Sequence, residues 1–320
     1  MIRSRLAAAK RIGFVGLGSM GSGMAANLVA KLAAGKPEGQ ALLFDRSGVA
    51  VQRVVAEAAA VAEAAVDLPQ LAAKCDIVFL CLPEGGVVLD AVRTMSPTLR
   101  EGALVVDSST TSPAVAQKAA QQLGQRGVGF LDAPVTGAPA RAAAGTLTSM
   151  VGGSEKHLEA ARPFLGTFAT KILHMGEVGN GQLAKALNNC LYNVSCAAMA
   201  EMLPFALRAG LPMPAFVDAV TSGTGQSFGF NQWASLVLQR EFEAPKHGFP
   251  MGAAFKDLET LVAAASAEGL PVPPVVAATL ATYQRALAMG LGEEHKGAMV
   301  KVWEAQLGVC CSGTEAEQKK

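Results

Sequence analysis

The sequence predicts an α/β protein in which a doubly wound parallel sheet is followed by an all-α C-terminal domain. In the first half, short apolar runs alternate with Ala-rich helical segments, a pattern typical of βαβ units. A Gly-x-Gly-x-x-Gly loop follows the first apolar run. After about residue 175 strand-like runs stop, and long helical stretches broken by Pro and Gly follow.

The composition favours a protein that acts on a small molecule. A chain of 320 residues is long enough for two domains, each with its own core. Its 27 basic and 26 acidic residues give a formal charge of +1, which offers no electrostatic reason to bind nucleic acid. The longest apolar runs fall far short of the roughly 20 residues that cross a bilayer, so we expect no membrane segment.

The cysteines and histidines indicate neither disulfides nor a metal centre. The six cysteines lack Cys-x-x-Cys spacing, which indicates reduced thiols in the cytoplasm. The four histidines show no metal-ligand spacing, so we expect no catalytic metal. The basic start MIRSRLAAAKR leaves open a short mitochondrial targeting segment, although a strand from Ile12 leaves little room for one.

Six apolar runs are the expected strands of the first domain. They are IGFVG (12–16), ALLFD (41–45), DIVFLCLP (76–83), ALVVDSS (103–109), GVGFLDAPV (127–135) and LTSMV (147–151). The Ala-rich segments MAANLVAKLAA and VQRVVAEAAAVAEAA between them favour helix. The glycines of GEVGNG (176–181) suggest the domain boundary. We therefore expect domains at 11–176 and 177–309, with frayed termini at 1–10 and 312–320.

The glycine loop GLGSMG lies between an expected strand and an expected helix, the context that dinucleotide binding requires. Its residues are Gly16, Leu17, Gly18, Ser19, Met20 and Gly21. In this Rossmann-type arrangement the first glycine permits the turn, the second lets a pyrophosphate approach, and the third lets the helix pack closely. The diphosphate would lie on the helix N-terminus. A glycine turn that only packs remains the alternative.

Two adjacent residues bear on which dinucleotide binds. Asp45 ends the second expected strand, where a carboxylate can accept hydrogen bonds from the adenosine ribose. A carboxylate there repels the 2′-phosphate of NADP, which favours NAD. Arg46 leaves NADP open, because an arginine can pair with that phosphate.

Lys185 is an isolated charge on an apolar helical segment, with no other charge between Glu177 and Glu201. Asn189 lies four residues later on the same face, while Leu187 and Leu191 belong to another stripe that we expect to pack in the core. An ammonium can donate a proton to a carbonyl oxygen during hydride reduction, and the neutral amine can accept one in reverse. A snorkelling lysine remains the alternative.

Four stretches in order, from Ile12 to about Trp303, resemble the β-hydroxyacid dehydrogenase family of 3-hydroxyisobutyrate dehydrogenases and semialdehyde reductases. They are GFVGLGSMGSGMAANL (13–28), DAPVTGAPARAAAGTLTSMVGG (132–153), GNGQLAKALNNCL (179–191) and FPMGAAFKDL (249–258). The resemblance implies a hydride transfer between NAD(P) and a small 3-hydroxy acid or semialdehyde. It also implies a homodimer or homotetramer formed through the helical half.

The resemblance implies roles for residues in each stretch. Lys185 matches the catalytic lysine and Asn189 the asparagine that assists it, while Thr136, Gly137 and Ala138 occupy the Ser-Gly-Gly positions that bind the substrate carboxylate. The implied cofactor contacts outside the glycine loop are Leu82, Pro83, Thr110 and Lys256. Two departures bear on the substrate: Val87 replaces an asparagine, and EEHKGAM (293–299) replaces an Asp-x-Ser-Ala pattern.

Two other functions stay open at this point. An imine reductase of related architecture often has a different proton donor at the lysine position, and the retained Lys185 and Asn189 argue against it. A non-catalytic dinucleotide-binding module is the alternative from a different class. The lysine and the largely intact carboxylate segment favour the enzyme.

Overall fold

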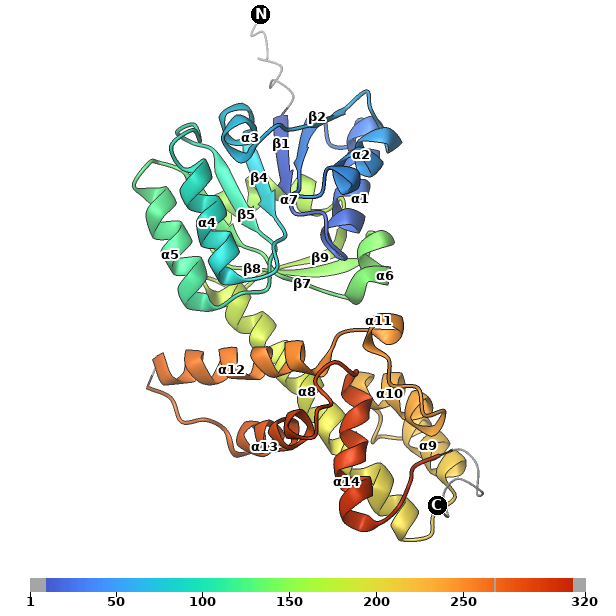
Figure 1. The fold of residues 1–320 in the computed structure, drawn as a ribbon. Helices are drawn as coiled ribbons and strands as arrows, with labels where there is room; N and C mark the ends of the chain where they lie inside the picture. Colours follow the sequence, from blue (N-terminus) through green and yellow to red (C-terminus); the bar gives the residue numbers. More distant parts are fainter. Residues whose placement is uncertain (1–9, 268, 313–320) are drawn as a thin grey trace, which may run out of the picture. The chain divides into compact units, whose positions relative to one another are not determined.

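A computed structural model describes residues 10–267 and 269–312, which form two compact units divided between Lys185 and Ala186 (Figure 1). The predicted domain boundary at 176/177 lies nine residues earlier, and the two units are described separately below. Of the termini predicted to fray, Lys10 is the first residue of a strand and Ser312 is buried. The remaining terminal residues and most of the open targeting segment lie outside the described residues.

The first unit contains a six-stranded parallel sheet with strand order β3-β2-β1-β4-β5-β6. Its strands are β1 (Lys10–Val15), β2 (Gly39–Phe44), β3 (Ala62–Ala64), β4 (Ile77–Leu80), β5 (Leu104–Asp107) and β6 (Gly129–Asp132). The order 3-2-1-4-5-6 reverses direction between β1 and β4, and ligands of such sheets bind at the carboxyl ends of the strands there. The predicted fold class is confirmed.

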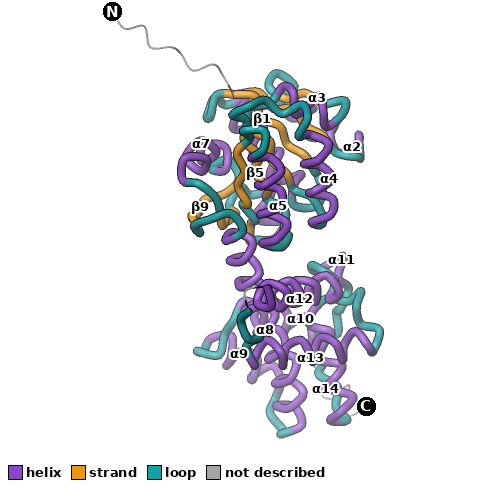
Figure 2. Tube along the Cα trace, turned by 90° about the vertical axis from the view of Figure 1, so that its left-hand side faces the viewer, coloured by secondary structure: helices purple, strands orange, loops and turns teal. Residues whose placement is uncertain are grey.

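Helices cover both faces of this sheet. They are α1 (Gly21–Ala33), α2 (Gly48–Glu57), α3 (Leu68–Lys74), α4 (Gly85–Met95), α5 (Pro113–Gly124) and α7 (Glu155–Leu165). One apolar core joins the sheet to α1, α2 and α7, and the other joins it to α3, α4 and α5. Figure 2 shows the strands between α7 and α4. Because both faces are buried, strands such as β4 are apolar at every position.

A smaller three-stranded sheet completes the first unit. Its strands are β7 (Val135–Thr136), β8 (Leu147–Val151) and β9 (Ala169–His174), with α6 (Ala138–Ala143) between β7 and β8. Strand β7 pairs antiparallel with β8, and β8 pairs parallel with β9. The turn from β7 into α6 thus holds the segment predicted to bind a carboxylate.

Strands β3 and β9 are absent from the expected set, and the helix predicted over 51–65 is wrong in its second half. Helix α2 ends at Glu57, and the residues after it turn back to pair Ala62–Ala64 with β2. Alanine favours helix locally, but the parallel pairing with β2 overrides that preference.

The second unit is helical, as predicted. Its elements are α8 (Asn180–Arg208, which begins in the first unit), α9 (Met213–Ser222), α10 (Phe228–Leu238), α11 (Ala244–His247), α12 (Met251–Ala267), α13 (Pro274–Ala288), the 3₁₀ helix η1 (Lys296–Met299) and α14 (Val300–Leu307). Ser227 caps α10 by accepting a hydrogen bond from the Phe230 N–H. Most of these helices pack around α8 (Figure 1).

The apolar stripe of α8 does not lie where the sequence predicts it. Leu187 is 48% exposed and Leu191 is 73% exposed, whereas the buried face carries Asn193 and Cys196. Among the described residues, α8 is the one helix long and apolar enough to cross a membrane. Half of its most apolar stretch is buried in the protein, and core helices share this composition, so α8 is weak evidence for a membrane span.

Candidate active site

The three motif glycines of the loop, Gly16, Gly18 and Gly21, lie in different environments. Gly16 has φ +94°, and a Cβ there would lie 2.2 Å from the Cys81 carbonyl oxygen. A Cβ on Gly21 would lie 2.0 Å from the Gly16 carbonyl oxygen. A Cβ on Gly18 would meet no atom within 4 Å. Gly16 and Gly21 therefore permit the tight strand-to-helix turn, and Gly18 leaves open space at the start of α1, where a diphosphate fits.

Asp45 is joined directly to this loop. Its carboxylate accepts hydrogen bonds from the Leu17 N–H (2.6 Å) and the Ser47 N–H (2.7 Å). The side chain is half-buried at the end of β2, while Arg46 is exposed. The acidic residue predicted to hold the ribose thus lies beside the loop predicted to hold the diphosphate.

The loops after β4 and β5 are linked by Ser109. Its hydroxyl accepts a hydrogen bond from the Leu82 N–H (2.8 Å), and Pro83 and Thr110 are the exposed residues that follow Leu82 and Ser109. Below them, Asp107 is fully buried and accepts a hydrogen bond from the Ser109 N–H. Burial raises the pKa of Asp107 to about 7; the hydrogen bonds with Ser109 oppose this shift and the charge of Asp132 adds to it.

The segment predicted to bind a carboxylate forms the turn between β7 and α6. Thr136 is half-buried, Gly137 has φ +140°, and Ala138 has φ +60°, in the left-handed region that alanine rarely adopts. Helix α6 packs against the start of α1, where a Cβ on Gly23 would lie 2.8 Å from the backbone of Ala143. This packing holds the predicted carboxylate segment beside the helix that begins at the glycine loop.

Buried polar residues fix the start of α8 to the same end of the sheet. Asp132, which ends β6, accepts hydrogen bonds from the N–H groups of Gly179 (2.8 Å) and Gln182 (2.9 Å), which caps the helix with a negative charge. The Gln182 side chain accepts from the Thr111 N–H and donates to the Ser109 carbonyl, each at 2.8 Å. Gln182 therefore holds both neighbours of Thr110.

Lys185 lies one turn after Gln182 on the same face of α8 and is 9% exposed. Asn189 follows one turn later and donates a hydrogen bond to Asp257 of α12 (2.8 Å). Sequence reasoning missed Asp132, Gln182 and Asp257. All three lie within the quoted stretches, but only the contacts distinguish them from their neighbours.

The structure thus brings together most of the predicted residues of the first unit: the glycine loop, Asp45, the loops of Leu82 and Thr110, the Thr136 turn and Lys185. Asn189 and Lys256 belong to the second unit, where Lys256 is exposed on α12. Within residues 10–267 and 269–312, no group of three or more His, Cys, Asp or Glu side chains can hold a metal ion.

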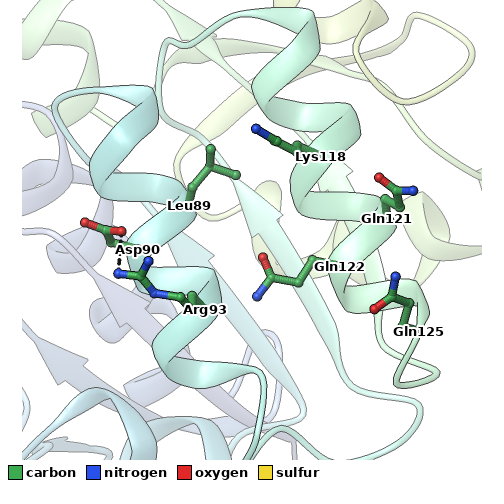
Figure 3. Close-up of a pocket in the computed structure, with 7 residues that line it drawn as sticks. All are labelled: Leu89, Asp90, Arg93, Lys118, Gln121, Gln122 and Gln125. Atoms are coloured by element: carbon green, nitrogen blue, oxygen red, sulfur yellow. Dashed lines mark hydrogen bonds and ion pairs between the residues drawn. The ribbon is translucent and has the colours of Figure 1, made fainter.

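A surface hollow between α4 and α5 is a separate feature (Figure 3). It is lined by Leu89, Asp90, Arg93, Lys118, Gln121, Gln122 and Gln125. Arg93 pairs with Asp90 at 2.8 Å, and both side chains are mostly exposed. The lining contains none of the predicted site residues.

Comparison with known proteins identifies the family. Residues 11–176 match the family described as the NAD-binding domain of 6-phosphogluconate dehydrogenase. Residues 179–303 match the family described as NAD-binding of NADP-dependent 3-hydroxyisobutyrate dehydrogenase. These two matches correspond to the two units and account for nearly the whole chain.

Individual relatives agree with the family matches. The chain is 34% identical to 2-(hydroxymethyl)glutarate dehydrogenase of Eubacterium barkeri over 95% of this chain and 98% of the relative. It is 33% identical to an NAD-dependent L-serine dehydrogenase of Pseudomonas aeruginosa over 93% and 99% of the two chains.

Solved structures share the fold. A Mycobacterium tuberculosis 3-hydroxyisobutyrate dehydrogenase with L-serine has a TM-score of 0.80 at 30% identity, covering 92% of this chain and 98% of that one. An imine reductase from Pseudomonas is 19% identical with a TM-score of 0.55, which shows the fold alone. The chain therefore belongs to the β-hydroxyacid dehydrogenase family, and it is an NAD(P)-dependent oxidoreductase of small 3-hydroxy acids.

Proposed function

We propose that Lys185 is the residue that transfers the proton in the reaction of this enzyme, and that Asn189 assists it. The observation that carries this proposal is the position of Lys185 one turn after Gln182, whose side chain holds Ser109 and Thr111 on either side of Thr110. This arrangement supports the proposal that the Lys185 amine lies at the carboxyl ends of the parallel strands, where sheets of this kind bind a dinucleotide.

The chemical step follows from these roles. When bound at the glycine loop, NAD(P) would supply the acceptor for the hydride that leaves the carbinol carbon of the substrate. The neutral Lys185 amine accepts the hydroxyl proton as the C=O bond forms, and in the reduction direction its ammonium returns that proton to the carbonyl oxygen. Asn189, oriented by its hydrogen bond to Asp257, hydrogen-bonds the substrate oxygen or the amine.

The turn at Thr136 is the proposed binding site for the substrate carboxylate. The Thr136 hydroxyl and the N–H groups of Gly137 and Ala138 are donors suited to an anion. The positive φ angles of Gly137 and Ala138 support this role, because strained backbone is commonly kept where a ligand approaches.

The proposed cofactor site combines the glycine loop with Asp45, Leu82, Pro83, Thr110 and Lys256, within a dinucleotide-binding domain at 11–176. NAD is the proposed physiological cofactor. Asp45 is tied to the glycine loop by its hydrogen bond with Leu17, so the carboxylate stays where a 2′-phosphate would be repelled. Arg46 is exposed and is the residue through which NADP would be accepted.

The helical domain at 177–309 is the proposed oligomerisation domain, forming a homodimer or homotetramer in the cytoplasm. Helix α8 exposes Leu191 (73%) and Phe205 (63%), together with Leu187 and Met202. Exposed apolar side chains on one helix favour contact with a second copy of the chain. Light scattering of the purified protein measures the number of subunits.

The proposal is tested by following NADH formation with pairs of alcohols that differ only in the carboxylate. We expect oxidation of 3-hydroxyisobutyrate and not of its amide. In Thr136→Val, which keeps the shape of the side chain and removes the hydroxyl, we expect the KM for the acid to rise about tenfold, because a hydrogen bond to a charge is lost. Equal rates with acid and amide would contradict the carboxylate site.

A further inference from the structure

Asn27 joins the helix that begins at the glycine loop to the helix that follows the Thr136 turn. It lies on α1 and is partly buried. Its side-chain amide donates hydrogen bonds to the carbonyls of Ala142 and Ala143 in α6, each at 3.0 Å, and to the Gly23 carbonyl of its own helix at 2.8 Å. Helices α1 and α6 both belong to the first unit (Figure 1). The proposed reaction gives Asn27 no role.

The two α6 carbonyls lie at the end of that helix, where backbone acceptors lose their helical donors. The turn after α6 replaces one of these donors. Gly145, at φ +65°, donates from its N–H to the Ala142 carbonyl (3.2 Å), as in the Schellman motif that commonly ends a helix. The motif gives no donor to the carbonyl of the last helical residue, Ala143, and Asn27 supplies one.

The surroundings of the Asn27 side chain require a donor. Three carbonyl oxygens lie within 3.0 Å of Nδ2, so an acceptor in that place would have no hydrogen-bond partner. On the other side of the amide, a Cβ on Gly145 would lie 2.8 Å from Oδ1. A carboxylate of the same shape would place an oxygen against three oxygens, which would repel it.

Helix α6 is the element through which Asn27 reaches the proposed carboxylate site. The helix is six residues long and begins at Ala138, whose N–H is one of the proposed donors. Its other end is fixed to α1 by the Asn27 amide and by the close approach of Gly23 to Ala143. Helix α1 begins at Gly21 of the glycine loop. Asn27 therefore fixes the Thr136 turn relative to that loop.

We propose that Asn27 is a positioning residue for the reaction, which holds α6 on α1 so that the Thr136 turn presents the bound acid at the distance that hydride transfer requires. The proposal rests on the proposed function, in which this turn binds the carboxylate. A misplacement of about 1 Å can cost about 100-fold in rate. A small shift of α6 is therefore expected to slow the chemical step while the acid still binds to the turn.

The test measures the rate of NADH formation from 3-hydroxyisobutyrate in a single turnover. Asn27→Asp keeps the size of the side chain and replaces the donor by an oxygen. Asn27→Ala removes the side chain and lets water reach the α6 carbonyls, because the site is partly exposed. We expect the rate to fall about 10- to 100-fold in Asn27→Asp and about threefold in Asn27→Ala. A side chain that only fills space would give the opposite order.

A second variant and a matched control accompany these two. Asn27→Leu keeps the bulk, has no donor and keeps water from the carbonyls, so we expect a loss of about tenfold even if Asn27→Asp fails to fold. Asn231→Asp makes the same chemical change at an exposed asparagine of α10 and should react at the wild-type rate. The KM for NAD should stay within about twofold of wild type in every Asn27 variant, because the glycine loop keeps its own contacts.

Binding without turnover separates positioning from loss of the carboxylate site. Calorimetry with isobutyrate in the presence of NAD⁺ should give the Asn27→Leu variant a Kd within about threefold of wild type, since the turn keeps its donors. A wild-type rate in Asn27→Leu would overturn the proposal. A loss of isobutyrate or NAD⁺ binding as large as the loss of rate would also overturn it, because the variant would then have disordered the site.

The wild-type protein distinguishes failure of this proposal from failure of the proposed function. If wild type binds isobutyrate no better than isobutyramide, or forms no NADH from 3-hydroxyisobutyrate, the proposed function fails and the role of Asn27 fails with it. If wild type prefers isobutyrate and forms NADH, while Asn27→Leu does so at the same rate, the positioning role alone is wrong.

Discussion

Asp107 should make the protein less stable as the pH rises toward neutrality. Its carboxyl group is completely buried at the end of β5, where Oδ1 accepts a hydrogen bond from the Ser109 N–H. Among the residues that the structure describes, Oδ2 has no hydrogen-bond partner. Burial raises its pKa from 3.8 to about 7 in the folded protein. Between pH 4 and 7 the folded state therefore keeps a proton that the unfolded chain releases. Each rise in pH within that window lowers the free energy of unfolding.

The size of this effect follows from the pKa difference. A shift from 3.8 to about 7 corresponds to a cost of about 4 kcal/mol above pH 7, at about 1.4 kcal/mol per pKa unit. The contribution of Asp107 is fully present below about pH 4 and lost above about pH 7. Between pH 5 and pH 8, linkage gives a loss of about 2 to 3 kcal/mol from this one group.

Asp107→Asn removes the titrating group and keeps its size. Between pH 5 and pH 8, we expect the free energy of unfolding of this variant to rise by about 2 to 3 kcal/mol relative to that of the wild type. Urea unfolding monitored by circular dichroism at several pH values measures it. Asp90→Asn, at an exposed residue paired with Arg93, should show no such gain. The same pH dependence in wild type and Asp107→Asn would refute the reasoning.

Three further predictions concern the cofactor loop and the carboxylate turn. The free energy of unfolding of Gly18→Ala should lie within about 0.5 kcal/mol of the wild-type value because the added Cβ meets no atom, but its KM for NAD should rise about tenfold or more. Gly21→Ala should lose a few kcal/mol of stability, because its Cβ would clash with the Gly16 carbonyl oxygen. Urea denaturation and NAD kinetics compare the two variants. Ala138→Gly should raise the free energy of unfolding by about 1 kcal/mol, measured by urea denaturation, because it relieves the left-handed alanine. Asp45→Ser should raise the ratio of NADP to NAD kcat/KM about tenfold in steady-state assays, and an unchanged ratio would contradict the role of Asp45.

Much of the fold could be predicted because its signals are local. Continuous apolar runs such as IVFL of β4 indicate strands that are buried on both faces of the sheet. The spacing of Gly16, Gly18 and Gly21 identifies the turn into α1. Strand β3 could not be predicted because Ala-Glu-Ala has no strand preference, and its pairing with β2 decides the conformation.

Only some residues of the candidate site could be predicted from the sequence. Lys185 is recognisable in the sequence because it is a single charge on an apolar helix. Asp132 and Gln182 are not recognisable, because their roles depend on hydrogen bonds that span from 47 to 73 residues.

The central claim is that the amine of Lys185 moves the substrate proton, and single-turnover kinetics of Lys185→Ala test it most directly. With saturating NAD⁺ and hydroxy acid, we predict that NAD⁺ binds as in wild type and that NADH forms two to four orders of magnitude more slowly, as is typical when a general acid or base is removed. Lys118→Ala, at an exposed lysine of α5, should react at the wild-type rate. NADH formation by Lys185→Ala within a few-fold of wild type would contradict the account.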